Sequence, residues 1–146
     1  MEVEIVIKKE LQETKLVIYC NELTKEVQQL VDRLGAMQCK TVAGIQDENI
    51  FLLNPEDIDC FYSENQKVYA KVGKKAFWVK KKLYELEEML TGTSFVRVSN
   101  SCIVNMDQVD RLDISYAGTI ELILKTGERE FVSRRYMSKI KKYLGI

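Results

Sequence analysis

The chain has 146 residues, of which 46% are hydrophobic and 30% are charged, as expected for one folded domain with an extension or for two small domains. It contains no histidine, which removes the commonest general base and transition-metal ligand, and its seven glycines are too scattered to form a phosphate-binding loop. The composition therefore predicts neither an enzyme nor a bound cofactor or metal.

The charges are unevenly distributed, although the net charge is zero. Residues 1–57 carry 6 basic and 11 acidic side chains, whereas residues 58–146 carry 16 basic and 11 acidic ones. A basic half can attract a polyanion. The acidic start differs from a signal peptide, and no apolar run approaches the roughly 18 residues of a membrane span, so a cytoplasmic location is expected.

The cysteines are too far apart to form a recognisable motif. No Cys-x-x-Cys pair is present, so the spacing favours neither a zinc knuckle nor a redox dithiol. Each cysteine lies in or beside an apolar stretch, and we expect four reduced thiols in the core: Cys20, Cys39, Cys60 and Cys102.

The first third of the chain predicts a small βαβ-like α/β segment. Residues 2–8 and 15–20 have strand-like patterns, and residues 21–35 form an amphipathic helix with Asn21 as its N-cap and Gly35 at its end. Two short strands follow at residues 40–45 and 49–53. The only proline, Pro55, marks the expected boundary between domains 1–54 and 55–146.

The remainder of the chain predicts a mostly-β domain with one internal and one C-terminal helix, so the fold class is α+β and β-rich. Residues 57–72 form a hairpin that turns at 64–66, and residues 75–90 run from a strand into a helix. Residues 94–105 supply further strands, and residues 110–133 form a meander of three.

Three small polar residues interrupt the apolar strand pattern at Ser99, Asn100 and Ser101. Such residues often form a turn with local hydrogen bonds. They also suit a loop that reads an external ligand, because one asparagine amide can both donate to and accept from an adenine edge. The residues alone leave both interpretations open.

Two adjacent arginines, Arg134 and Arg135, follow Ser133, the expected N-cap of the last helix. The positive end of the helix dipole disfavours cations there. The arginines either pair with Glu128 and Glu130, or are solvated, or clasp an anion at the helix start. Because neighbouring helical residues diverge by about 100°, one arginine can meet a phosphate while the other reaches a guanine edge.

The segments "FVRVSNSCIVNMDQVDRLD" and "GTIELILKTGEREFVSRRYMSKIKKYL" resemble the LytTR DNA-binding domain of bacterial transcription regulators. The upstream segments "DIDCFYSENQKVYA" and "WVKKKLYELEEML" also match, so that the resemblance covers residues 55–146. It implies a β-rich domain that inserts loops and a helix start into successive major grooves of double-stranded DNA. Family members typically recognise direct repeats, often as dimers.

Carried over by position, the resemblance assigns the main DNA contacts to Asn100 and Arg135. Their neighbours Ser99, Ser101, Ser133 and Arg134 lie beside these contacts, and Ser99 stands where many members have histidine. The hairpin turn with Asn65 and Lys67 matches a third contact region.

The first 54 residues are too few for the receiver domain that the best-known members carry. They are similar to the N-terminal segment of short regulators in this family, and a dimerisation or regulatory role is expected. By family analogy, a small membrane protein is a further expected partner. The overall interpretation is a sequence-specific transcription regulator that forms a homodimer. Two alternatives stay open: a protein-interaction adaptor with an incidental basic face, and a phosphorylated-metabolite sensor that uses Arg134 and Arg135.

Overall fold

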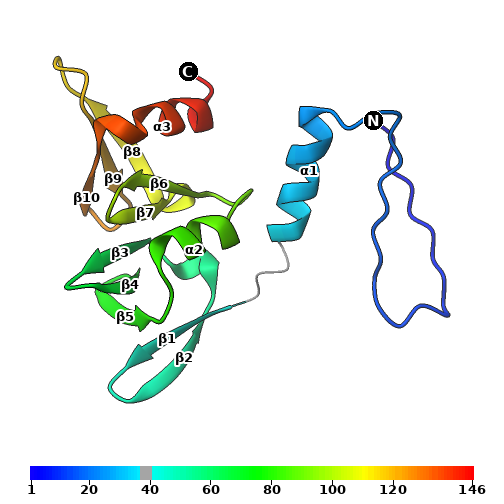
Figure 1. Ribbon diagram of the computed structural model, residues 1–146, viewed down its shortest axis with the longest axis horizontal. Helices are drawn as coiled ribbons and strands as arrows, with labels where there is room; N and C mark the ends of the chain where they lie inside the picture. Colours follow the sequence, from blue (N-terminus) through cyan, green and yellow to red (C-terminus); the bar gives the residue numbers. More distant parts are fainter. Residues whose placement is uncertain (37–40) are drawn as a thin grey trace.

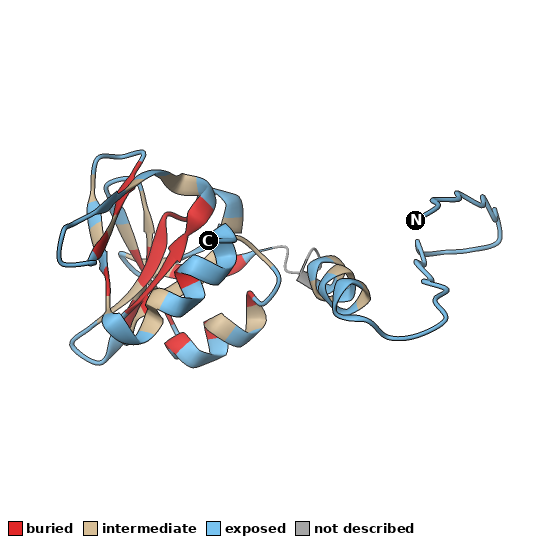
Figure 2. Ribbon diagram, turned by 90° about the horizontal axis from the view of Figure 1, so that it is seen from above, coloured by how far each residue is buried: buried red, intermediate tan, exposed pale blue. Residues whose placement is uncertain are grey.

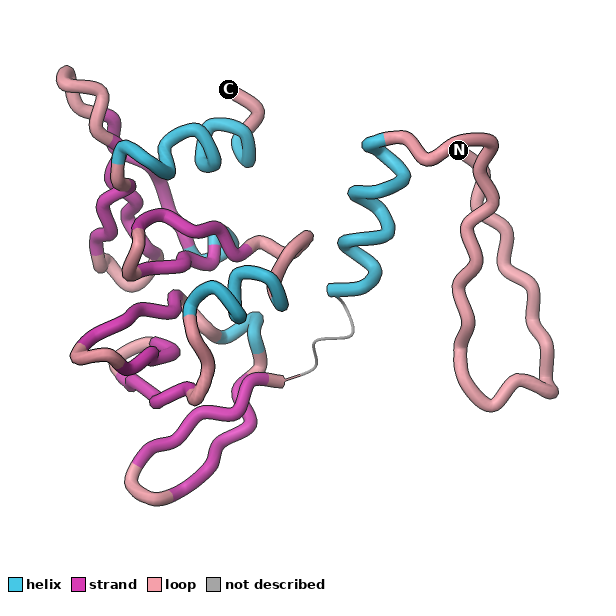
Figure 3. Tube along the Cα trace, in the orientation of Figure 1, coloured by secondary structure: helices cyan, strands magenta, loops and turns pink. Residues whose placement is uncertain are grey.

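The computed structural model describes residues 1–36 and 41–146 (Figure 1). Residues 42–146 form a body of two β-sheets with two α-helices. The N-terminal segment and helix α1 (Lys25–Ala36) extend beside this body, and the tube in Figure 3 shows the segment before α1 as loop throughout. Cys39, expected in the core, lies outside the described residues.

Residues 1–22 form no strand, so the strands predicted at 2–8 and 15–20 are wrong. Their apolar side chains remain in solvent, with Val3, Ile5 and Ile7 exposed by 82%, 85% and 84%. Figure 2 shows the segment before α1 in the colour of exposed residues. A strand needs a neighbouring strand for its backbone groups and a surface for its apolar face, and this segment has neither. The predicted βαβ unit therefore does not form. Cys20 is exposed, which also contradicts its expected place in the core.

Helix α1 is present, but its cap differs from the predicted one. The Thr24 hydroxyl accepts a hydrogen bond from the Val27 backbone N–H at 3.3 Å, so Thr24, not Asn21, caps the helix. Gly35 lies inside the helix instead of ending it. The C-terminal part of α1 approaches the body at Gly92, where an added Cβ would lie 2.8 Å from the backbone carbonyl carbon of Asp32.

The larger sheet has seven strands in the order β2-β1-β5-β4-β3-β7-β6. Its first two hairpins turn on two residues with positive φ, Asp47-Glu48 and Asn65-Gln66, as tight hairpins require. Helix α2 (Leu83–Met89) connects β5 to β6. The strands are β1 (Val42–Gln46), β2 (Asn49–Leu53), β3 (Cys60–Glu64), β4 (Lys67–Val72), β5 (Lys75–Val79), β6 (Phe95–Ser99) and β7 (Cys102–Asn105).

The smaller sheet is the predicted meander, with strand order β10-β9-β8. Short 3₁₀ turns lie before β3, before β8 and after β10. Helix α3 is followed by Gly145, whose backbone is left-handed. The elements are β8 (Val109–Ile114), β9 (Ile120–Leu124), β10 (Arg129–Val132), the 3₁₀ turn η3 (Arg134–Tyr136) and α3 (Met137–Leu144).

Two hydrophobic cores lie on opposite faces of the larger sheet. Because strand side chains alternate, Phe61 packs with α2 on one face, whereas Cys60 packs with the smaller sheet and α3 on the other. The buried Asn105 joins the segments around it. Its side chain donates to the Ile58 carbonyl at 2.9 Å and accepts from the Ser94 hydroxyl and the Asp107 N–H.

The expected boundary after residue 54 does not coincide with a break in the sheet. Strand β1 pairs with β5 through Ile45 and Trp78, so the β1–β2 hairpin forms one edge of the larger sheet. Its inner face contributes Val42 and Leu53 to the core shared with α2. The role of residues 1–54 as a dimerisation or regulatory module stays a prediction.

Candidate nucleic-acid interface

The turn between β6 and β7 presents Asn100 and Ser101 to solvent. Arg97 holds this turn from within β6, because its Nε donates to the Ser99 carbonyl at 2.8 Å and its Nη2 donates to the Asn100 carbonyl at 2.6 Å. The Ser99 hydroxyl accepts from the Ser101 N–H at 3.2 Å. Local hydrogen bonds thus fix the backbone while the Asn100 side chain stays at the surface.

The two arginines lie in the 3₁₀ turn η3, which precedes α3, and not in its first α-helical turn. The predicted N-cap, Ser133, makes no capping hydrogen bond with its side chain. Both arginines are exposed, and within residues 1–36 and 41–146 no ion pair of either is found. Glu128 pairs with Lys71, so of the three alternatives for the arginines, pairing with Glu128 and Glu130 is not the one that the structure shows.

Two contacts join the β6–β7 turn to the segment around η3. The Tyr136 hydroxyl donates to the Asn100 Oδ1 at 3.0 Å, although the two residues are 36 positions apart. The Ser133 backbone N–H donates to the Val98 carbonyl at 2.9 Å. The two segments that the resemblance singled out therefore form one continuous surface.

The predicted third segment, the β3–β4 turn, adjoins the β6–β7 turn. The Ser63 N–H donates to the Ser101 carbonyl at 2.9 Å, and Asn65 lies exposed two residues further along. The Lys67 Nζ lies 4.8 Å from the centre of the Trp78 ring, a distance typical of a cation–π contact. Lys67, the first residue of β4, thus places its charge beside Trp78 of the neighbouring strand β5.

A carboxylate from α2 organises the cations around Tyr136. The Glu87 Oε2 lies 3.6 Å from Arg97 Nη1, and its Oε1 lies 3.7 Å from Lys139 Nζ. These contacts tie α2, β6 and α3 together and partly neutralise both cations. Arg134 and Arg135 are exposed next to this cluster, and within the described residues neither is held by a carboxylate.

Arg97, Tyr136 and Lys139 were not predicted as site residues. Arg97 carried a signal, since it is the one charge between the apolar Val96 and Val98 in a strand pattern. Tyr136 carried none, because its partner is distant in the sequence. Of the predicted residues, the structure joins Ser99–Ser101 and Ser133–Arg135 directly, and it joins Asn65 through Ser63.

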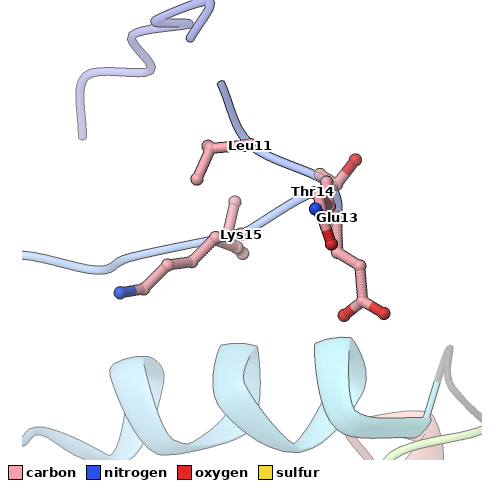
Figure 4. A pocket seen from close by; sticks show the side chains of 6 residues that line it. Leu11, Glu13, Thr14 and Lys15 are labelled. Carbon is pink, nitrogen blue, oxygen red and sulfur yellow. The ribbon is translucent and has the colours of Figure 1, made fainter. Parts of the chain in front are cut away.

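The hollow in Figure 4 lies elsewhere and is lined by six consecutive residues, 11–16. Because one open loop forms it, with Lys15 extended away from Glu13, it offers no converging set of polar groups.

Among the described residues no helix has the length and apolarity needed to cross a membrane.

Comparison with known sequences identifies the family. Residues 48–145 match the sequence model of the LytTr DNA-binding domain. The chain belongs to the LytTR DNA-binding domain family. This match confirms the expected family and begins inside the β1–β2 hairpin, which is consistent with the place of that hairpin in the larger sheet.

The relatives and a solved structure agree with this assignment. An uncharacterised HTH-type transcriptional regulator from Staphylococcus aureus strain NCTC 8325 is 31% identical over 92% of this chain and 91% of its own length. Its counterpart from strain MRSA252 is 30% identical over the same shares. The LytTr DNA-binding domain of a protein described as a methyl-accepting/DNA response regulator from Bacillus cereus superimposes with a TM-score of 0.69 at 25% identity. The superposition covers 73% of this chain and 98% of that one, and it confirms the α+β, β-rich fold class.

Proposed function

We propose that this LytTR protein is a cytoplasmic transcription regulator that binds specific double-stranded DNA sequences in the major groove. The Tyr136–Asn100 hydrogen bond is the observation that carries the proposal, because it joins the β6–β7 turn to the arginine-bearing turn η3. Base-reading groups and phosphate-binding groups then share one surface, which is what sequence-specific binding requires.

Asn100 retains the capacity to read a base. Its Oδ1 accepts one hydrogen bond from Tyr136 and has a second lone pair, and within residues 1–36 and 41–146 its Nδ2 makes no hydrogen bond, which leaves both hydrogens for an external acceptor. An adenine edge offers one donor and one acceptor in the matching arrangement. In this proposal Asn100 reads a base, Arg135 contacts a guanine edge, and Arg134 contacts phosphate.

The first experiment is selection of bound sequences from a random duplex pool, followed by anisotropy titration of the selected duplex at two salt concentrations. Replacing Arg135→Ala or Asn100→Ala is expected to weaken specific binding by about 1–3 kcal/mol, roughly 5- to 150-fold, without lowering the melting temperature. Arg134→Ala is expected to weaken all duplexes similarly and to reduce the salt slope by about 1.

Two variants serve as matched controls. Arg111 of β8 is an exposed arginine like Arg134 and Arg135, but it is paired with Asp110 and Asp113. Asn49 is exposed at the start of β2, directly after the β1–β2 turn. Arg111→Ala and Asn49→Ala are expected to bind like the unmodified protein. Equal losses in the controls, or no enriched sequence at all, would contradict the proposal.

Arg97 is proposed as a positioning residue for the turn that carries Asn100. Arg97→Lys keeps the charge but cannot donate to both the Ser99 and Asn100 carbonyls with one planar fork. We expect loss of discrimination at the base read by Asn100, with little change in the salt slope. A change in the salt slope without loss of discrimination would assign Arg97 to phosphate contact instead.

We further propose that two copies bind direct repeats as a homodimer through residues 1–54. The support is the unpacked apolar side chains of Val3, Ile5 and Ile7, which burial against a second copy would remove from water. Inserting half a helical turn, about 5 base pairs, between selected repeats should abolish cooperative binding. A single site bound with full affinity by a monomer would refute this part alone.

A further inference from the structure

We propose that Cys60, Cys102 and Glu130 form a binding site for a thiophilic divalent cation of the zinc type. The two thiol sulfurs and a carboxylate oxygen all lie within 4.8 Å of one another. They come from β3, β7 and β10, so the fold assembles a cluster that the sequence spacing does not reveal.

The two cysteines share one face of the larger sheet. In the antiparallel β3–β7 pair, Cys60 stands opposite Val104 and Tyr62 stands opposite Cys102, which makes the cysteines diagonal neighbours. Their exposed fractions are 1% and 4%. Both thiols therefore face the smaller sheet inside the core that the two sheets share.

Glu130 approaches the thiols from the smaller sheet, and its position is unusual. Along β10, Glu130 and Val132 face inward, whereas Phe131 points outward and is 66% exposed. A strand that only packed a core would place the phenylalanine inward and the acid outward. The carboxylate thus occupies a core-facing position beside two sulfurs.

The described groups that stabilise the Glu130 carboxylate are the charge of Lys71 and a hydrogen bond with the Cys102 thiol. The nearby Lys71 pairs with Glu128, not with Glu130. Burial, reinforced by the charge of Glu128, raises the pKa of Glu130 above its ordinary value. A divalent cation would give this half-buried carboxylate a direct ionic partner, with the two deprotonated thiols as its other protein ligands.

The ligand set fits zinc chemistry. Thiolate and carboxylate oxygen bind Zn²⁺ at about 2.3 Å and 2.0–2.2 Å, which sets tetrahedral ligands roughly 3.5–4 Å apart, so the side chains must close in by about 1 Å. A water or small anion would occupy the fourth position. Binding breaks both S–H bonds and releases two protons to solvent, so the affinity should rise with pH.

The site lies at the base of the interface, and this step of the inference rests on the proposed function. Cys102 directly follows Ser101 in the β6–β7 turn, and Glu130 lies three residues before Ser133. A cation that joined β7 to β10 would fix the two DNA-contacting segments relative to each other. We therefore expect Zn²⁺ to increase DNA affinity.

The test uses the full chain with Cys20→Ser and Cys39→Ser, which removes the two other thiols, in the presence of a non-thiol reductant. Titration with Co²⁺ should produce sulfur-to-cobalt charge-transfer absorption, and equilibrium dialysis should give one Zn²⁺ per chain. Adding Cys60→Ser or Cys102→Ser should weaken Zn²⁺ by more than about 100-fold, since loss of an outer-shell partner already costs 10- to 100-fold. Glu130→Gln should weaken it by about 10-fold or more.

Melting curves without metal identify any variant that fails to fold, and the half-buried Glu130→Gln then carries the test. Absence of the cobalt absorption, or equal Zn²⁺ affinity in folded Cys60→Ser or Glu130→Gln, would overturn the site. Unchanged DNA affinity with Zn²⁺ bound would overturn only the coupling to DNA. Failure to select any DNA sequence would remove the proposed function and leave the metal result standing.

Discussion

The N-terminal segment and the sheet-rich body contain similar apolar patterns, yet only the body forms strands. Residues 2–8 alternate as regularly as β4, but Ile5 is 85% exposed whereas Ala70 of β4 is fully buried. The difference is the surroundings. Strand β4 lies between β3 and β5 and packs against α2, whereas residues 2–8 have no neighbouring strand. The alternation of apolar and polar residues thus predicts which face a strand would bury, but the strand forms only where a neighbouring strand and an apolar surface are present.

The largest expected effect on stability comes from truncating a buried apolar side chain of the body, and truncating an exposed one in the N-terminal segment provides the comparison. Leu86 of α2 is completely buried in the core between the helix and the larger sheet. Leu86→Ala should lower the free energy of unfolding by about 2–5 kcal/mol, through lost burial and a residual cavity. Ile5→Ala should change it by less than about 0.5 kcal/mol, because Ile5 is in solvent. Urea unfolding measures both.

The result for Ile5→Ala distinguishes an N-terminal segment that packs on its own body from one that packs on a second copy. If Ile5→Ala destabilises the protein as much as a core substitution at low protein concentration, the N-terminal segment packs on its own body. If it does so only at high concentration, a second copy supplies the missing partner, as proposed for the homodimer.

Sequence-based prediction succeeded in most of the body and failed in the N-terminal segment. The hairpin turns at 47–49 and 64–66, the helix near 83–90 and the meander at 110–133 were predicted correctly, because turn residues and apolar periods are local signals. The strands at 2–8 and 15–20 were wrong, since pairing partners are not local. The N-caps at Asn21 and Ser133 were wrong for a similar reason, because several polar residues near a helix start compete for the role.

The residues of the candidate site also fall into those that a sequence pattern indicates and those that only the fold brings together. A family pattern indicated Asn100 and Arg135, which the family match supports but does not test. The Tyr136–Asn100 hydrogen bond joins residues 36 positions apart, and the cluster of Cys60, Cys102 and Glu130 draws on three strands. Such groupings depend on strand order and register, which no local pattern encodes.

The joint between the two regions offers a second, intermediate test. Gly92 has a φ of +83°, and an added Cβ would lie 2.8 Å from the Asp32 carbonyl carbon and oxygen in α1. Gly92→Ala should cost about 1–3 kcal/mol for the left-handed backbone and should also displace α1. Hydrogen exchange at the α1 amides should accelerate accordingly.

Gly73 is the matched control for this substitution. Its φ is +60°, but nothing lies within 4 Å of an added Cβ. Gly73→Ala should therefore incur a similar backbone cost without affecting the α1 amides. Equal exchange of those amides in both variants would mean that α1 does not rest on Gly92 in solution, and the two regions would then be independent.

The smallest expected effect tests the helix starts of the two regions against each other. Thr24 and Ser133 both precede helical segments, but only the Thr24 hydroxyl accepts a backbone hydrogen bond. Thr24→Ala should destabilise α1 by about 0.5–1 kcal/mol, seen as faster exchange of its first amides and reduced helicity. Ser133→Ala should leave the exchange of α3 amides unchanged, since no capping bond is lost and Ile140 still anchors that helix in the core. A larger effect at Ser133 than at Thr24 would show that the capping bond contributes less to these helix starts than burial in the body does.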